Sequence, residues 1–261
     1  MRRLAVNADD FGFTCDVNRG IVEAHRNGIL TSTTLMANGA AFDDAVRLAR
    51  ENPTLDIGIH GVLVQGPGLP SDVKALIQAL VLRRIQPYDE LKRQVDRILE
   101  AGIRPSHFDT HKHTHLLPPV LDAVARLCQE YRISWVRRPV DLPLTTPPAE
   151  VPLSTRLVSR AMAGVRGRFH RVLSRRGLKT PDHFAGFQLT GRFHTRHLVE
   201  LIRALPDGFT EFMCHPGYCT DELRAARTRL KESRQRELAA LLDPAVRAAV
   251  DESGVRLCAY Q

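Results

Sequence analysis

Short apolar runs alternate along the chain with longer stretches in which apolar residues recur every three or four positions. Short runs are typical of strands buried in a parallel sheet, and the longer spacing is typical of helices that pack one face on such a sheet. The predicted strands cover residues 3–7, 31–36, 56–59, 107–109, 134–137, 209–214 and 255–260. The predicted helices cover residues 16–26, 118–131, 198–205 and 223–242. We therefore expect an α/β fold, a TIM-like (β/α) barrel formed as a single domain by residues 1–261.

Acidic and histidine side chains gather where the predicted strands end. Asp9 and Asp10 follow the first strand, His60 follows the third, and His215 follows the sixth. The loops after the strands of a barrel converge over one mouth, where active sites are assembled. Taken singly, His60 would more often be a surface or core residue, and the Asp9 and Asp10 pair could cap a helix. Their shared location at strand ends favours one common site.

The segment 107–115, His-Phe-Asp-Thr-His-Lys-His-Thr-His, has His or Asp at five of its nine positions. So many polar side chains next to apolar sequence are costly to bury unless their charge is neutralised or a metal is bound. We expect the run to supply one or two metal ligands together with the side chains that orient them. In an extended segment, alternate side chains would point to one side, namely His107, Asp109, His111, His113 and His115.

The mixture of Asp and His indicates the kind of metal. It suits Zn²⁺, Mn²⁺, Fe²⁺ or Co²⁺, whereas Mg²⁺ prefers oxygen ligands. No cysteine lies near His60 or the run 107–115 in the sequence, which argues against a structural zinc site. We expect one catalytic divalent ion, with zinc first and manganese, cobalt or magnesium as alternatives. Such an ion can lower the pKa of water and polarise a carbonyl, as amide hydrolysis at neutral pH requires.

The cysteines and the amino-terminal sequence bear on the compartment. The five cysteines are odd in number and include no Cys-x-x-Cys pair, which argues against a disulfide framework and favours a reducing compartment. Only a short apolar run precedes Asp9, so no signal-peptide core is predicted. No later run approaches the roughly 18 apolar residues typical of a membrane span. We therefore expect a cytoplasmic protein.

Residues 156–179 contain eight Lys or Arg and no Asp or Glu, a charge equal to the +8 of the whole protein. Apolar residues in this stretch keep a helical spacing, which predicts a basic amphipathic helix interrupted near Gly164 and Gly167. We expect it to form a helical insertion around residues 140–180, after a proline-rich loop over 140–152. The stretch is either a solvated face that packs on the barrel or a peripheral contact with an anionic membrane.

Several motifs occur in order from near the first residue to near the last. They are Val-Asn-Ala-Asp-Asp-Phe-Gly (6–12), Thr-Ser-Thr-Thr-Leu-Met-Ala-Asn-Gly (31–39), Gly-Ile-His (58–60), the run at 107–115 and Met-Cys-His-Pro-Gly-Tyr (213–218). Together they resemble the YdjC-like carbohydrate deacetylases. That family includes chitooligosaccharide deacetylases and a branch associated with hopanoid lipid biosynthesis. The resemblance implies a distorted (β/α) barrel that hydrolyses the N-acetyl group of a glucosamine-type sugar.

The resemblance also implies roles for individual residues. Asp10, His60 and His111 match the metal ligands of the family. Asp9 matches the general base that activates the attacking water, and His215 matches the residue that protonates the leaving amine. The assignment is chemically coherent, because amide hydrolysis needs a base for water and an acid for nitrogen.

The expected partner is an N-acetylated sugar, free or lipid-linked, and residues 61–65 depart from the family pattern where its identity would be set. One alternative is a metal-dependent hydrolase of another bond, such as a phosphoester, which two metals about 3.5 to 4 Å apart would favour. Another is a non-catalytic binder of nucleic acid or anionic membrane through residues 156–179. A basic patch does not require a rim of His and Asp, so no specific nucleic acid is expected. A homodimer and the roles of His113 and His115 stay open.

Overall fold

The computed structural model describes residues 1–142 and 151–260. At its centre is one sheet with the strand order β5-β4-β3-β2-β1-β7-β6, and β8 lies beside β1. All strand pairings in the described residues are parallel. The strands are β1 (Arg2–Phe11), β2 (Ser32–Leu35), β3 (Asp56–Gly61), β4 (His107–Thr110), β5 (Trp135–Val136), β6 (His183–Ala185), β7 (Gly208–Cys214) and β8 (Arg256–Leu257).

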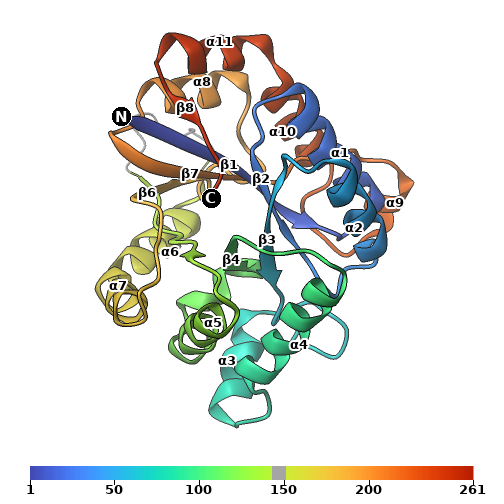
Figure 1. Ribbon diagram of the computed structural model, residues 1–261, viewed down its shortest axis with the longest axis vertical. Helices are drawn as coiled ribbons and strands as arrows, with labels where there is room; N and C mark the ends of the chain where they lie inside the picture. Colours follow the sequence, from blue (N-terminus) through green and yellow to red (C-terminus); the bar gives the residue numbers. More distant parts are fainter. Residues whose placement is uncertain (143–150, 261) are drawn as a thin grey trace.

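The sheet curls into a half-barrel with helices around its outside (Figure 1). The predicted α/β fold, a TIM-like barrel in a single domain, is confirmed. At the edge formed by β5, two isolated parallel bridges join the chain to the segment that leads into and forms β6. One links Trp135 with Lys179, and the other links Asp141 with Phe184, where the Leu142 N–H donates to the Phe184 carbonyl. Closure by isolated bridges in place of a full strand pairing is the distortion of the barrel.

Helices follow most of the strands. They are α1 (Cys15–Asn27), α2 (Phe42–Glu51), α3 (Val73–Val81), α4 (Pro87–Glu100), α5 (Pro118–Tyr131), α6 (Leu153–Gly164), α7 (Arg166–Arg175), α8 (Thr195–Arg203), α9 (Asp221–Ala225), α10 (Glu232–Leu242) and α11 (Pro244–Glu252), with a 3₁₀ segment η1 (His111–Leu116). The prediction of one helix over residues 223–242 is wrong. Residues 226–231 separate α9 from α10, because this segment leaves the helical path to line the cavity described below.

Some elements were not predicted, namely α2, α3, α4, α11 and β6. The signal for α4 is present in the sequence, since Leu91, Val95 and Ile98 recur at helical spacing and are fully buried. Strand β6 has only three residues, which is too short for a pattern of alternation to stand out. Short elements of this kind are defined by their neighbours in the sheet more than by their own residues.

The basic stretch contains α6 and α7, which are separated at Val165, close to the interruption expected between Gly164 and Gly167. Phe169 and Leu173 of α7 are buried, and α7 packs against α5. That the stretch is an insertion stays a prediction, and most of the expected loop over 140–152 lies outside the described residues. In the described parts of the chain, no helix combines the length and the apolar character needed to cross a membrane.

Candidate active site and metal centre

A bulge at the end of β1 brings two consecutive carboxylates to the same place. The pairing of β1 with β2 slips between Ala8 and Phe11, and Asp10 has a φ of 72°. In a regular strand, consecutive side chains point to opposite faces, but a bulge redirects one of them. Both Asp9 and Asp10 therefore line a single cavity at the carboxyl end of the sheet.

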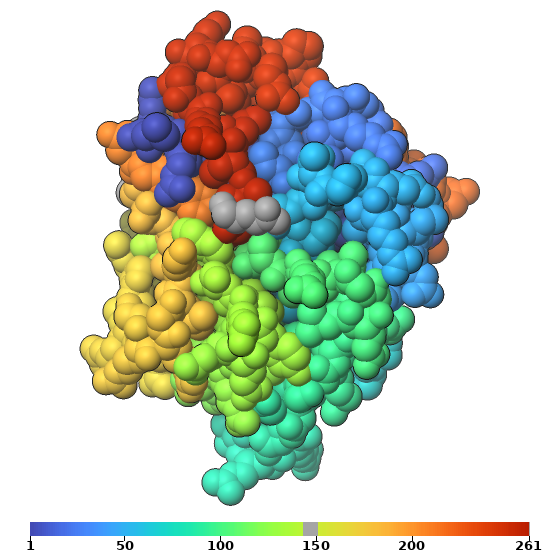
Figure 2. Space-filling model, in the orientation of Figure 1, coloured from blue at the N-terminus to red at the C-terminus, as the bar shows by residue number. Residues whose placement is uncertain are grey.

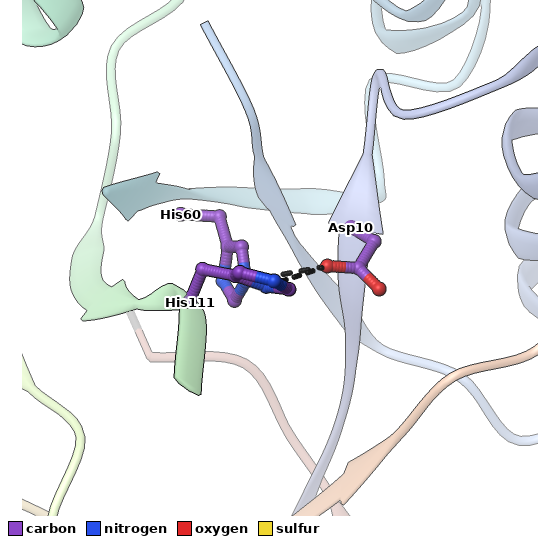
Figure 3. Close-up of side chains that lie close together, drawn as sticks. All are labelled: Asp10, His60 and His111. Carbon is purple, nitrogen blue, oxygen red and sulfur yellow. Dashed lines mark hydrogen bonds and ion pairs between the residues drawn. The ribbon is translucent and has the colours of Figure 1, made fainter. Parts of the chain in front are cut away.

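Three side chains from separate segments converge beside this bulge. Asp10 comes from β1, His60 from β3 and His111 from the start of η1 (Figure 3). Asp10 Oδ1 lies 3.3 Å from His60 Nε2 and 3.4 Å from His111 Nδ1, and the two nitrogens are 3.3 Å apart. The structure thus brings together the three residues that the sequence analysis expected to hold a metal.

The donor set fits a divalent ion. Three ligand atoms held about 2.0 to 2.1 Å from a tetrahedral zinc ion lie about 3.4 Å from one another, close to the separations found here. Asp10 Oδ1 is buried and makes no hydrogen bond of regular geometry. Such an atom is costly unless an ion or another partner satisfies it. The chemistry of one carboxylate and two imidazoles suits zinc or another first-row divalent metal.

Neighbouring side chains orient the two histidines. Asp109 of β4 binds Nδ1 of His60, so Nε2 of that ring faces Asp10. Gln65 Oε1 lies 3.2 Å from Nε2 of His111, which leaves Nδ1 of that ring toward Asp10. A partner on the far nitrogen of each imidazole is the usual arrangement around a protein-bound metal, where it fixes the tautomer and the ring orientation.

The electrostatics of the cluster favour a cation at this point. Burial opposes a charge on His60, yet Asp109 and Asp9 raise its pKa to about 10. Burial also opposes ionisation of Asp10, but Arg234 and the two histidines hold the pKa of that carboxyl well below its usual value. A surplus of carboxylate charge that stabilises a proton on His60 stabilises a divalent cation in the same way.

Arg137 is the fully buried centre of a carboxylate cluster next to the triad. Its guanidinium donates to both oxygens of Asp9 at 2.6 and 2.7 Å, lies 2.7 Å from Asp109 and donates to Glu211 at 2.6 Å. Asp9, His60 and Asp109 also lie close enough together to suggest a second metal group. Because Arg137 already supplies the positive charge between the two carboxylates, this second group does not fit a metal ion.

His215 lines the same cavity as the triad. Its Nε2 lies 3.9 Å from Asp9 Oδ2, and its backbone N–H donates to Glu237 of α10 at 2.6 Å. Burial lowers the pKa of the His215 imidazole to about 4, so the ring is neutral at pH 7. Burial also raises the pKa of Glu237 to about 7. The structure therefore places both sequence-predicted catalytic residues, Asp9 and His215, within reach of one another beside the triad.

The cavity that contains these groups has a volume of about 970 Å³. A cavity of this size accepts a molecule as large as an oligosaccharide unit. Its outer part carries several cationic side chains, including Lys112, Arg192 and Arg229. Burial lowers the pKa of Arg229 and of Lys112, and in each case another arginine nearby adds to the effect.

The run 107–115 is not extended throughout, so its five alternating polar side chains do not share one side. The strand ends at Thr110, and Lys112 and His113 take left-handed backbone angles inside η1. Polar side chains at this strand end bond locally instead, as when Thr110 Oγ1 accepts the His115 N–H at 2.9 Å. The turn sends the alternate side chains of the run to different surroundings.

Three histidines of the run consequently have no place in the triad. His107 is buried at the start of β4, bonded to Asn7 and stacked on Tyr260. His115 lies between Thr110 and the Arg137 carbonyl, and so supports the backbone of Arg137, which directly follows β5. His113 lines the cavity with its Nδ1 unpartnered.

Comparison with known proteins identifies the family. The YdjC-like protein family model matches residues 3–252. The chain belongs to the YdjC-like family. Curated YdjC-like relatives include a carbohydrate deacetylase of Geobacillus stearothermophilus, 36% identical and covering 100% of this chain and 97% of its own length. A chitooligosaccharide deacetylase of Salmonella paratyphi B is 31% identical, over 98% and 96% of the two chains.

Solved structures share this fold over nearly the whole chain. A putative cellobiose-phosphate cleavage protein from Enterococcus faecalis superposes with a TM-score of 0.75 at 26% identity, over 99% of this chain and 97% of the other. A lactam utilization protein from Thermus thermophilus shares the fold, with a TM-score of 0.51 at 14% identity, over 98% of each chain. The YdjC-like barrel is thus similar over its whole length to known structures.

Four charged residues of this YdjC-like site were not named from the sequence: Arg137, Glu211, Arg234 and Glu237. The sequence does give a signal for Arg137 and Glu211, because a charged residue is unusual in a buried strand. Arg137 is the last residue of the strand predicted over 134–137, and Glu211 lies inside the strand predicted over 209–214. Arg234 and Glu237 carry none, because they lie on an amphipathic helix where exposed charges are ordinary. Arg234 reaches Asp10 across 224 residues of sequence, and only the fold reveals that pairing.

Proposed function

We propose that this protein is a metal-dependent hydrolase that removes the acetyl group from an N-acetylated, glucosamine-type sugar. The observation that carries the proposal is the convergence of Asp10, His60 and His111 beside Asp9 and His215 in one cavity. Membership of a family whose curated relatives are named carbohydrate deacetylases supports the choice of reaction and of substrate class.

Asp10, His60 and His111 would hold one divalent ion, with zinc as the first candidate. Such an ion supplies Lewis-acid polarisation of the acetyl carbonyl and lowers the pKa of water. Asp109 and Gln65 keep the imidazoles in the orientation that binding requires. Arg234 pairs with the second oxygen of Asp10 and leaves the first oxygen directed at the two histidines.

Asp9 and His215 would move the protons of the reaction. Arg137 holds Asp9 ionised and oriented, so the carboxylate can accept a proton from the attacking water. His215 is neutral at pH 7 and must gain a proton before it can serve as the acid. The Nε2 atom of His215 is 3.9 Å from Asp9 Oδ2. A small movement of either side chain would let Asp9 pass the proton to His215, which would then give it to the leaving amine. A base and an acid on the two sides of the amide are what its hydrolysis needs.

The test is acetate release from a panel of N-acetylglucosamine-containing sugars. Protein stripped of metal should be inactive, and resupply of Zn²⁺, Mn²⁺, Co²⁺ or Mg²⁺ should restore activity to different extents. We expect His111→Ala to lose both bound metal and activity, and Asp9→Asn to lose activity while retaining metal. Metal binding through His111 without acetate release from any sugar would contradict the proposed reaction and leave the metal centre standing.

Hydrolysis of another bond, such as a phosphoester, is the second candidate. The cationic side chains Lys112, Arg192 and Arg229 in the cavity favour an anionic substrate. Against it, phosphoester hydrolases often use paired metals, and Arg137 occupies the only neighbouring carboxylate group described here that could form the second site. Phosphate release from sugar phosphates, with one or two metals counted per chain, separates the candidates.

A further inference from the structure

The exposed apolar side chains of this protein are concentrated on two helices. In the described part of the chain, the large apolar residues that are most exposed, apart from Met1, belong to α3 and α6 or directly follow them. On α3 they are Ile77, Val81 and Leu82, which are 44%, 77% and 57% exposed. On α6 they are Leu153, Leu157, Val158 and Val165, which are 76%, 63%, 49% and 38% exposed. Scattered apolar residues need no explanation, but a grouping of this kind marks an interaction surface.

The segments that contain these two helices, together with α7 and the residues that follow, account for the net positive charge of the protein. Residues 73–86 contain three Lys or Arg, residues 153–179 contain eight, and neither segment contains an Asp or Glu. Because these segments carry +11 and the whole chain carries +8, the remaining residues carry a net charge of −3. The cations are also free of ion pairs: Arg160, Arg168 and Arg171 are exposed, and no described carboxylate lies within ion-pair distance of them.

Both helices begin beside the cavity. Val73, the first residue of α3, and Thr155, in the first turn of α6, line the cavity that holds the candidate metal centre. Figure 2 shows α3 projecting from the body of the molecule, and Figure 1 shows α7 at its edge. We call the exposed apolar and basic side chains of residues 73–86 and 153–179 the docking surface.

We propose that the docking surface binds an anionic lipid bilayer, so that the cavity opens next to the membrane. A bilayer offers anionic headgroups above a continuous apolar layer, and so satisfies arginines and leucines that alternate on one short helix. A second copy of this chain fits less well, because a symmetric contact would bring like charges together. The surface is separate from the residues that would carry the chemistry, so the inference does not depend on the proposed reaction.

The test is cosedimentation of the full chain with vesicles of phosphatidylcholine and of phosphatidylcholine mixed with phosphatidylglycerol. We expect binding to the mixed vesicles that weakens as salt is raised. The double variant Arg160→Gln, Arg168→Gln should lower the partition coefficient on the order of 10-fold, since each basic residue near an anionic surface contributes to binding. The matched control is Arg104→Gln, Arg196→Gln, which removes the same charge from exposed sites elsewhere and should leave binding unchanged.

A second pair of substitutions tests the apolar contribution. Leu153→Ser, Leu157→Ser changes exposed side chains, so folding should be preserved, and it should weaken vesicle binding even in high salt. Equal binding by the two arginine variants, or no binding of the wild type to mixed vesicles at low salt, would overturn the proposal. So would a wild-type dimer that Leu153→Ser, Leu157→Ser converts to a monomer, because a second copy would then cover the surface. These measurements need no sugar, so their failure is distinct from a failure of the proposed deacetylation.

Discussion

The carboxylate of Asp109 connects the two charged clusters of the site, because it binds Nδ1 of His60 and also contacts Arg137. Removing the charge without changing the size, as in Asp109→Asn, should weaken the orientation of His60. Loss of such a partner typically lowers metal affinity about 10- to 100-fold. We expect a decrease of that order in zinc affinity, measured by competition with a chromophoric chelator.

The matched control for this substitution is Asp56→Asn. Asp56 is also buried, but it lies at the opposite end of β3 and accepts the Tyr260 N–H. It should leave zinc affinity unchanged even if it costs stability. A wild-type affinity in Asp109→Asn would show that His60 is oriented by other contacts.

The site illustrates which residue roles a sequence can reveal. His and Asp at strand ends stand out because the surrounding residues are apolar, and the fold then brings Asp10, His60 and His111 together. The bulge that directs both Asp9 and Asp10 into one cavity depends on the pairing of β1 with β2. The residues of β1 alone do not specify that pairing. The ion pair of Arg234 with Asp10 depends on the docking of α10, and so lies beyond a reading of local pattern.

At the scale of elements, α1 holds the loop that carries His215. A Cβ atom on Gly20 of α1 would lie 2.5 Å from Gly217 Cα, a backbone atom that has little room to move. Gly20→Ala should lower the free energy of unfolding by about 1 to 3 kcal/mol, as overpacking does. It should also lower kcat, since even a 1 Å displacement of a catalytic group can cost on the order of 100-fold.

Urea denaturation and acetate release measure these two effects. Gly164→Ala is the control, because a Cβ at that position of α6 meets no atom within 4 Å. An alanine in a helix should raise stability there by about 0.5 to 1 kcal/mol. If Gly20→Ala were as stable and as active as the wild type, close packing of α1 on the loop would not be what positions His215.

Element prediction succeeded where periodicity was long and failed where other elements decide the structure. Helices α1 and α5 match their predicted ranges closely. The expected helix over residues 223–242 breaks because residues 226–231 line the cavity, a tertiary demand that the apolar spacing does not express. The run 107–115 turned for a similar reason, since Thr110 bonds to His115 and ends the strand.

At the scale of the whole molecule, alternation of strands and helices was enough to predict the barrel, because few folds bury short apolar strands between amphipathic helices. It was not enough to predict how the barrel closes. The bridge between Asp141 and Phe184 depends on the Asp141 carboxylate, which accepts the backbone N–H groups of Gly186, Phe187 and Gln188. No feature of either segment alone indicates that they meet.

The buried histidines of the core should make the stability of the whole molecule depend on pH. Burial lowers the pKa of His107 and of His115 from 6.5 to about 4. At pH 7 both are neutral in the folded and unfolded chain. As the pH falls from 6.5 toward 4, only the unfolded chain takes up the proton, so each histidine lowers the free energy of unfolding. Over the whole of this pH range, the decrease is on the order of 3 kcal/mol for each histidine.

The net curve will not isolate this effect, because Glu211 and Glu237 have a pKa raised to about 7 and act with the opposite sign. The comparison to make is therefore wild type against His107→Gln, by urea denaturation at a series of pH values. His107→Gln should be less stable at pH 7, because it loses the stacking on Tyr260, but its stability should fall less between pH 6.5 and 4. The two stability curves should converge toward pH 4. Parallel curves over this range would show that His107 takes up its proton equally in the folded and unfolded states, and that its burial does not limit stability in acid.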